Sequence, residues 1–261
     1  MIASLTHSFQ SELLKSKRTV AFWLVVAGAF LTPAIVTIAR LIRYKSLPGL
    51  YASPDFWTSH WRSSWESMAL FLLPLGVILM ISLLTQLEYR NNTWKQLHTL
   101  PLTFTTIFLS KLSFIIAMVI SYFVLFNVGI FLSAIIPYLI VADVPYPQMN
   151  VPAGFFLQQN LYYFVDCLPI IALQYLLCLR FKNFLVPMGV GFLLWVGSLA
   201  SLSWNYGYTV PYTYDMYTYL KSGVTTKAII PDVNFHAIAI GYFITITLIA
   251  YVLYIKKEEK A

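Results

Sequence analysis

The sequence predicts an all-α polytopic membrane protein with six transmembrane helices. The chain of 261 residues is 59% hydrophobic and only 10% charged, whereas about a quarter of the residues in a soluble domain are charged. Its mean hydropathy is +0.72, and long stretches carry no charge. Six of these stretches approach the roughly 20 apolar residues that a helix needs to cross a bilayer. The composition therefore excludes a soluble enzyme and a disordered chain.

The six predicted spans are distributed over the whole chain and use roughly half of its residues. They cover about residues 20–39, 68–87, 112–136, 155–178, 183–203 and 235–255. The connections between them are too short for a further domain of ordinary size. We therefore expect residues 1–261 to form a single transmembrane domain.

The lysine and arginine residues in the connections predict the orientation. Eleven lie on the side that holds both termini, and six lie on the opposite side. Because basic residues accumulate on the cytoplasmic side, both termini are expected in the cytoplasm. A net charge of +7 would suggest nucleic-acid binding in a soluble protein. Here the cations cluster beside the spans, so we expect no nucleic-acid partner.

Residues 1–19 are expected to form an amphipathic helix on the inner membrane surface. Apolar residues recur there at helical spacing, with polar residues on the other faces. The apolar positions are Ile2, Leu5, Phe9 and Leu13, and the polar ones are Gln10, Glu12, Lys15 and Lys17. The alternative interpretation is a solvated tail with a chance periodicity.

The connection at residues 88–111 is longer than a simple helical hairpin needs. Asn91, Asn92 or Thr93 can cap a short helix over residues 94–99, which Pro101 would end. Thr103 or Thr105 can then cap a second helix leading into the third span. The short helix, with Trp94, Leu97 and Leu100, suits a docking surface for a cytoplasmic partner. An interfacial helix with an aromatic anchor explains the pattern equally well.

Two outer segments are rich in aromatic residues. Phe56, Trp57, Trp61 and Trp65 recur at helical spacing, which predicts an amphipathic helix anchored in the outer interface. A substrate or lipid contact is the alternative. Residues 204–234 contain six tyrosines with Pro and Gly, which predicts an aromatic segment that covers the outer side as a lid.

Polar residues inside the spans are candidates for a pathway, since ionisable groups in a membrane are expensive. The candidates are Asn127, Gln159, Asp166 and Gln174. Asp166 is the carboxylate placed deepest in a span. The alternative role for Asp166 is a hydrogen-bonded group that packs helices together. The four histidines lack the spacing of a metal site, so no bound metal is expected.

Two stretches resemble the permease subunits of ATP-binding-cassette exporters, in the type 2 permease family that includes lantibiotic- and bacitracin-immunity permeases. One is Glu12-Leu13-Leu14-Lys15 with Lys17-Arg18-Thr19, at the entry to the first span. The other is the 88–111 connection, where Asn92 replaces a glycine common in the family. Its matching residues are Glu88, Thr93, Trp94, Lys95, Leu97, Leu100, Pro101 and Lys111. Total length and six spans also agree.

The resemblance implies that the 88–111 connection forms a coupling helix that sits on an ATPase. Trp94, Lys95 and Leu97 would then face the ATPase, with Glu88 and Arg90 beside the dock. The sequence lacks a G-x-x-x-x-G-K-[ST] phosphate loop. A separate subunit would therefore bind ATP and Mg. This chain itself would be neither an enzyme nor a cofactor carrier. The resemblance further implies a bacterial inner-membrane location and a second permease subunit, identical or related. It also implies contact with membrane lipid and an amphipathic substrate such as an antimicrobial peptide, a small amphiphile or a lipid.

Two other classes of function fit the sequence less well. A self-contained secondary transporter would use Asp166 as a proton relay. Against it stand the single intramembrane carboxylate and the lack of an internal repeat in the sequence. A polytopic membrane enzyme ranks last, because the sequence contains no recognisable nucleophile, metal set or acid–base pair.

Overall fold

The computed structural model describes residues 2–17, 19–90, 103–147, 150–222, 230 and 232–258, and every regular element in these ranges is a helix. The main α-helices are α1 (Ile2–Ser16), α2 (Val20–Ile42), α3 (Leu47–Tyr51), α4 (Phe56–Ser67), α5 (Leu73–Arg90), α7 (Phe104–Ile140), α8 (Ala153–Arg180), α9 (Leu185–Ser201), α10 (Tyr214–Lys221) and α11 (Phe235–Glu258). Short turns of helix lie between them: η1 (Tyr44–Ser46), η2 (Met68–Leu72), η3 (Gly207–Thr209) and η4 (Pro211–Thr213). The predicted all-α class is confirmed.

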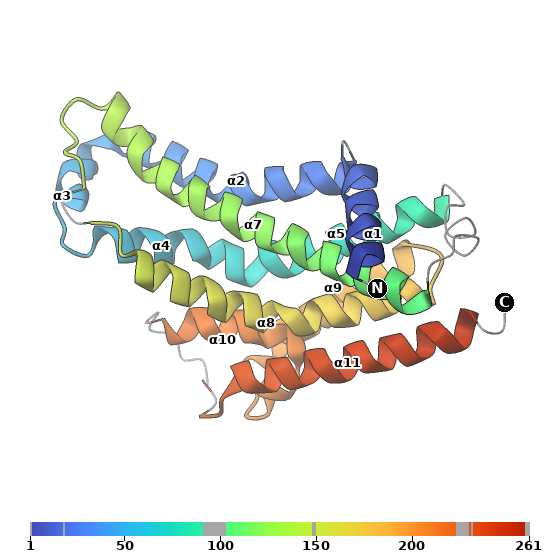
Figure 1. The fold of residues 1–261 in the computed structure, drawn as a ribbon. Coiled ribbons are helices and arrows are strands. Elements are labelled where there is room, and N and C mark those ends of the chain that lie inside the picture. The colour runs from blue at the N-terminus through green and yellow to red at the C-terminus, as the bar shows by residue number, and fades with distance from the viewer. Residues whose placement is uncertain are drawn as a thin grey trace.

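The long helices run roughly along one direction and form a bundle (Figure 1). α7 packs along α2, and α8 packs along both α5 and α11. α1 crosses the bundle near the end at which α11 finishes (Figure 1). α2 and α7 approach each other closely at Gly129, where a Cβ atom would lie only 2.7 Å from Cγ of Pro33. A larger residue at Gly129 would therefore push these two helices apart.

Among the described residues, five helices are long and apolar enough to cross a membrane. They cover Val20–Ile42, Phe56–Gln86, Phe104–Ile140, Ala153–Arg180 and Phe235–Lys256. Each contains one of the predicted spans. The run predicted at residues 183–203 forms α9, an apolar helix of 17 residues, at the lower end of the length that a spanning helix needs. That α9 is a sixth span stays a prediction.

The tryptophan-rich segment differs from its prediction. α4 continues through the π-helical turn η2 into α5, so the tryptophans belong to the second long helix. Trp57, Trp61 and Trp65 are only 2%, 1% and 0% exposed. Trp65 stacks on Tyr163 of α8 with ring centroids 3.8 Å apart, and it meets Phe126 of α7 at 5.2 Å. The predicted anchor in the outer interface is wrong, because these rings fill the space between α4, α7 and α8.

The tyrosine-rich segment forms η3, η4 and α10 within its described part. All residues of α10 except Lys221 are buried, and the helix packs against α8, η2 and α11. Tyr214 and Tyr217 form a cluster with Phe235 of α11. The part of the segment that forms α10 is therefore packed into the bundle, whereas Trp204 and Tyr206 before it are exposed. That the segment covers the outer side as a lid stays a prediction.

Candidate functional site

Asp166 lies on α8 and is fully buried, with 0% exposure. Its carboxylate accepts a hydrogen bond from the Thr218 hydroxyl of α10. Its other oxygen lies 2.7 Å from Nδ1 of His236, at the beginning of α11. One carboxylate thus joins three helices. Asn234 fixes the start of α11, because its Oδ1 accepts a hydrogen bond from the Ala237 amide at 3.2 Å, as N-cap residues do.

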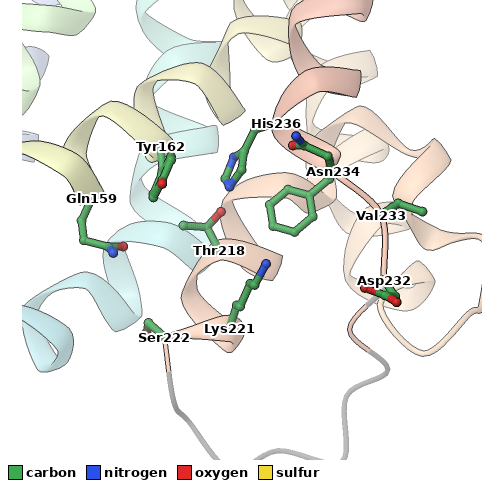
Figure 2. A pocket seen from close by; sticks show the side chains of 10 residues that line it. Gln159, Tyr162, Thr218, Lys221, Ser222, Asp232, Val233, Asn234 and His236 are labelled. Carbon is green, nitrogen blue, oxygen red and sulfur yellow. The ribbon is translucent and has the colours of Figure 1, made fainter.

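A pocket of about 550 Å³ opens beside this cluster, between α8, α10 and the start of α11. Figure 2 shows Gln159, Tyr162, Thr218, Lys221 and His236 around it. The Tyr162 ring stacks on the His236 imidazole, with centroids 4.6 Å apart and planes 16° apart. The structure therefore brings two of the predicted pathway residues together: Gln159 lines the pocket, and Asp166 holds the pocket residue His236.

A second buried carboxylate, which the sequence analysis missed, lies on α10. Asp215 is 1% exposed, and neither of its carboxylate oxygens has a hydrogen-bond partner among the described residues. Burial, together with the nearby Asp166 carboxylate, raises the pKa of Asp215 well above its usual range. Asp166 is therefore not the only buried carboxylate.

The other two pathway candidates lie in separate contacts. The Asn127 amide of α7 donates to Asn160 Oδ1 of α8 at 2.8 Å, and Asn160 donates back at 3.0 Å. Gln174 donates to Ser82 Oγ at 2.9 Å and to the Pro187 carbonyl at 3.0 Å, which ties α8 to α5 and α9. These contacts connect helices, and a pathway role for Asn127 and Gln174 stays a prediction.

Replacing Asn127 by leucine is expected to lower the free energy of unfolding by about 1 kcal/mol, because it removes both hydrogen bonds between α7 and α8 at Asn160; Asn160 keeps only its bond to the Phe156 carbonyl of its own helix. The double variant Asn127→Leu, Asn160→Leu removes both groups and is expected to be closer to the wild type than the single variant. Unfolding of the purified protein in mixed detergent micelles measures both differences. If the double variant loses as much unfolding free energy as Asn127→Leu and Asn160→Leu lose together, the two residues do not act as a direct pair.

The N-terminal segment forms α1, and its predicted interface residues bind it to the first turns of α7. The Phe9 ring meets Phe114 edge-on at 6.0 Å, and the Ser8 hydroxyl donates to Ser110 at 2.9 Å. Glu12 Oε1 lies 3.0 Å from Lys15 Nζ and 3.3 Å from Lys111 Nζ. Lys17 follows α1 and is exposed. The predicted segment forms a helix, and it is attached to the bundle by the Glu12–Lys111 salt bridge and these contacts. Its position on the inner membrane surface stays a prediction.

Lys111 was expected among the ATPase-docking residues, but its side chain is buried and turned toward Glu12. Burial alone would raise the pKa of Glu12, yet the charges of Lys111 and Lys15 outweigh it, and the net shift is downward from about 4.5. Glu12 is therefore ionised at neutral pH. Two motifs almost a hundred residues apart in sequence thus form one charged cluster.

This shift predicts a pH dependence. Because the folded-state pKa of Glu12 is lowered, its contribution to stability is present above its usual pKa of about 4.5 and is lost as the pH falls through the lowered value. Glu12→Gln is expected to lower stability by about 2 kcal/mol at neutral pH. The difference from the wild type should shrink in thermal unfolding below pH 4.5. The exposed carboxylate variant Glu66→Gln serves as the control and should differ little at either pH.

The remaining docking residues flank or lie outside the described part of the chain. Glu88 and Arg90 belong to the last turn of α5, without described side chains. Thr93, Trp94, Lys95, Leu97, Leu100 and Pro101 lie outside the described residues. On the other side of the gap, Thr103 caps α7 and accepts a hydrogen bond from the Thr106 amide at 3.2 Å. The cap predicted at Thr103 or Thr105 is therefore Thr103.

The helices and the buried polar groups between them define a multi-pass membrane protein. Within the described residues, no group of three or more His, Cys, Asp and Glu side chains is placed to hold a metal ion. A family model described as ABC-2 family transporter protein matches residues 8–198. The match covers more than half of the chain, so the chain belongs to the ABC-2 transporter family, whose members are membrane components of transporters. No curated protein and no solved structure matches it.

Proposed function

We propose that this chain is the permease subunit of an ATP-binding-cassette exporter, and that a separate subunit hydrolyses the ATP. Membership of the ABC-2 transporter family supports this proposal most strongly. The substrate is an amphipathic molecule: an antimicrobial peptide, a small amphiphile or a lipid. A second permease, identical or related, completes the pathway. The assembly contains two ATPase subunits, and the 88–111 connection is the docking site for an ATPase on this chain. The assembly resides in the bacterial inner membrane with both termini in the cytoplasm.

The contacts at the α7 end of this connection support its role in coupling. α1 is held to the first turns of α7 by the Glu12–Lys111 salt bridge and the Phe9–Phe114 contact. α7 begins at Phe104, within the last part of the connection, and continues for 37 residues, which is about 55 Å of helix. α7 can therefore transmit a displacement of the docked connection along the length of the bundle.

Co-purification in a mild detergent tests the proposal. The tagged wild-type chain is expected to retain an ATPase that contains a phosphate loop, and the double variant Trp94→Ala, Leu97→Ala is expected to lose it. Trp23→Ala is the matched control, because Trp23 is an exposed tryptophan on α2. If the wild type retains no ATPase, the exporter assignment is wrong. If the double variant retains it, the dock lies elsewhere.

A proton-coupled transporter that acts alone is the second candidate. The observation that favours it is the buried Asp166 beside a pocket residue, His236, with a further buried carboxylate, Asp215, nearby. The purified chain in liposomes distinguishes the two functions. Substrate flux driven by a pH gradient without any ATPase would support the proton-coupled transporter, and flux that needs the ATPase and ATP would support the exporter.

A further inference from the structure

The pocket between α8, α10 and α11 presents an uncommitted positive charge. Lys221 is exposed, and no carboxylate among the described residues lies within ion-pair distance of it. Its ammonium lies over the Phe235 ring, 5.8 Å from the centroid. A cation–π contact at an exposed site is weak. The ammonium can therefore turn to an anion in the pocket without breaking a salt bridge.

His236 adds a second group that is held in place. Its Nδ1 is engaged by the buried Asp166, and its ring is stacked on Tyr162. When both ring nitrogens carry a proton, Nδ1–H donates to Asp166 and Nε2–H is the donor that is left for an anionic ligand, in an orientation fixed by α8. A carboxylate that orients an imidazole in this way reduces the entropy lost when the other nitrogen binds.

The remaining lining favours an acceptor-rich ligand with an apolar part. The Gln159 amide supplies a further donor at the pocket wall, and Figure 2 shows it opposite Lys221 and His236. Asp232 also lines the pocket, and Figure 2 shows it beside Val233, on the other side of Lys221 from Gln159. The aromatic rings of Tyr162 and Phe235 provide apolar surface next to the donors.

We propose that this pocket binds a phosphate group, with Lys221 and Nε2 of His236 as its main ligands. A tetrahedral phosphate has enough oxygens to meet an ammonium, an imidazole and an amide at once, and charge-assisted hydrogen bonds to phosphate are strong. The phosphate comes either from the head of an amphiphile or from solution. If the chain transports what it binds, which rests on the proposed function, the substrate class is a phosphate-bearing amphiphile.

A titration of the purified full-length chain in a non-ionic detergent tests this site without any ATPase, so its outcome is separate from that of the co-purification. The probes are short-chain phosphatidic acid, diacylglycerol with the same acyl chains, and inorganic phosphate, and calorimetry measures their binding. Lys221→Gln is expected to weaken the binding of phosphatidic acid about tenfold or more. Lys221→Arg should restore most of it. Lys45→Gln, which removes another exposed lysine, should leave it within about twofold.

The controls separate binding from folding and identify the source of the phosphate. Because Lys221 is exposed, Lys221→Gln should unfold at the temperature of the wild type. If inorganic phosphate displaces phosphatidic acid at a similar concentration, the result supports a site for free phosphate. If displacement needs a much higher concentration of inorganic phosphate, the result supports a site for a lipid headgroup. Equal binding of phosphatidic acid and of diacylglycerol, which has no phosphate, would overturn the proposal. So would unchanged binding by Lys221→Gln.

Discussion

Asp166→Ala is expected to lower the free energy of unfolding by about 3–5 kcal/mol, because it removes one partner of a buried pair and leaves the other groups unpaired. The carboxylate accepts from Thr218 of α10 and contacts His236 of α11, and it is 0% exposed. The loss should separate α10 and the start of α11 from α8. Unfolding of the purified chain measured in detergent is the test.

Two further variants make the Asp166 test specific. Asp166→Asn keeps the size of the side chain and an acceptor for Thr218, so it should retain more stability than Asp166→Ala. Asp143→Ala removes an exposed carboxylate and should change stability by less than about 0.5 kcal/mol. If Asp166→Ala unfolds like Asp143→Ala, this carboxylate does not hold the three helices together. If Asp166→Asn stays folded and loses all transport, that result favours the proton-relay function.

Trp65→Ala is expected to lower the free energy of unfolding by about 3–5 kcal/mol, since it empties a large space in the core. The indole is completely buried, stacks on Tyr163 and meets Phe126. The matched control is Trp23→Ala on α2, where the indole is 59% exposed; its loss should be below about 1 kcal/mol. Similar losses in the two variants would contradict the burial of Trp65.

The long helices could be predicted from the sequence, because each is an apolar run of spanning length. The continuity of α4 with α5 could not. Trp57, Trp61 and Trp65 lie on one face of a helix, and tryptophan suits both a membrane interface and a packed core. Helical spacing gives the face of these rings but not what covers them. The contacts of Trp65 with Tyr163 and Phe126 show that this ring lies in a packed core.

The sequence predicts single members of the polar clusters, but it does not predict which residues pair. Asp166 was found from its position in an apolar run, but its partner His236 lies 70 residues away, and no local pattern joins them. Glu12 and Lys111 were both selected by resemblance, in two separate motifs. Their salt bridge, between residues 99 positions apart, depends on where α1 crosses α7. Asp215 was missed because a tyrosine-rich loop gives no sign that its residues are buried.

The most direct test of the coupling role is a cross-link at the predicted dock. The chain contains two cysteines, Cys167 and Cys178, and both are buried thiols, so replacing them provides a cysteine-free background. In that background, Trp94→Cys with a short bifunctional thiol reagent is expected to give a covalent product with the ATPase subunit. Lys45→Cys is expected to give none, because Lys45 belongs to η1, just before α3, at the end of the bundle away from the start of α7 (Figure 1). A co-purifying ATPase that cross-links to position 45 and not to position 94 would contradict the account.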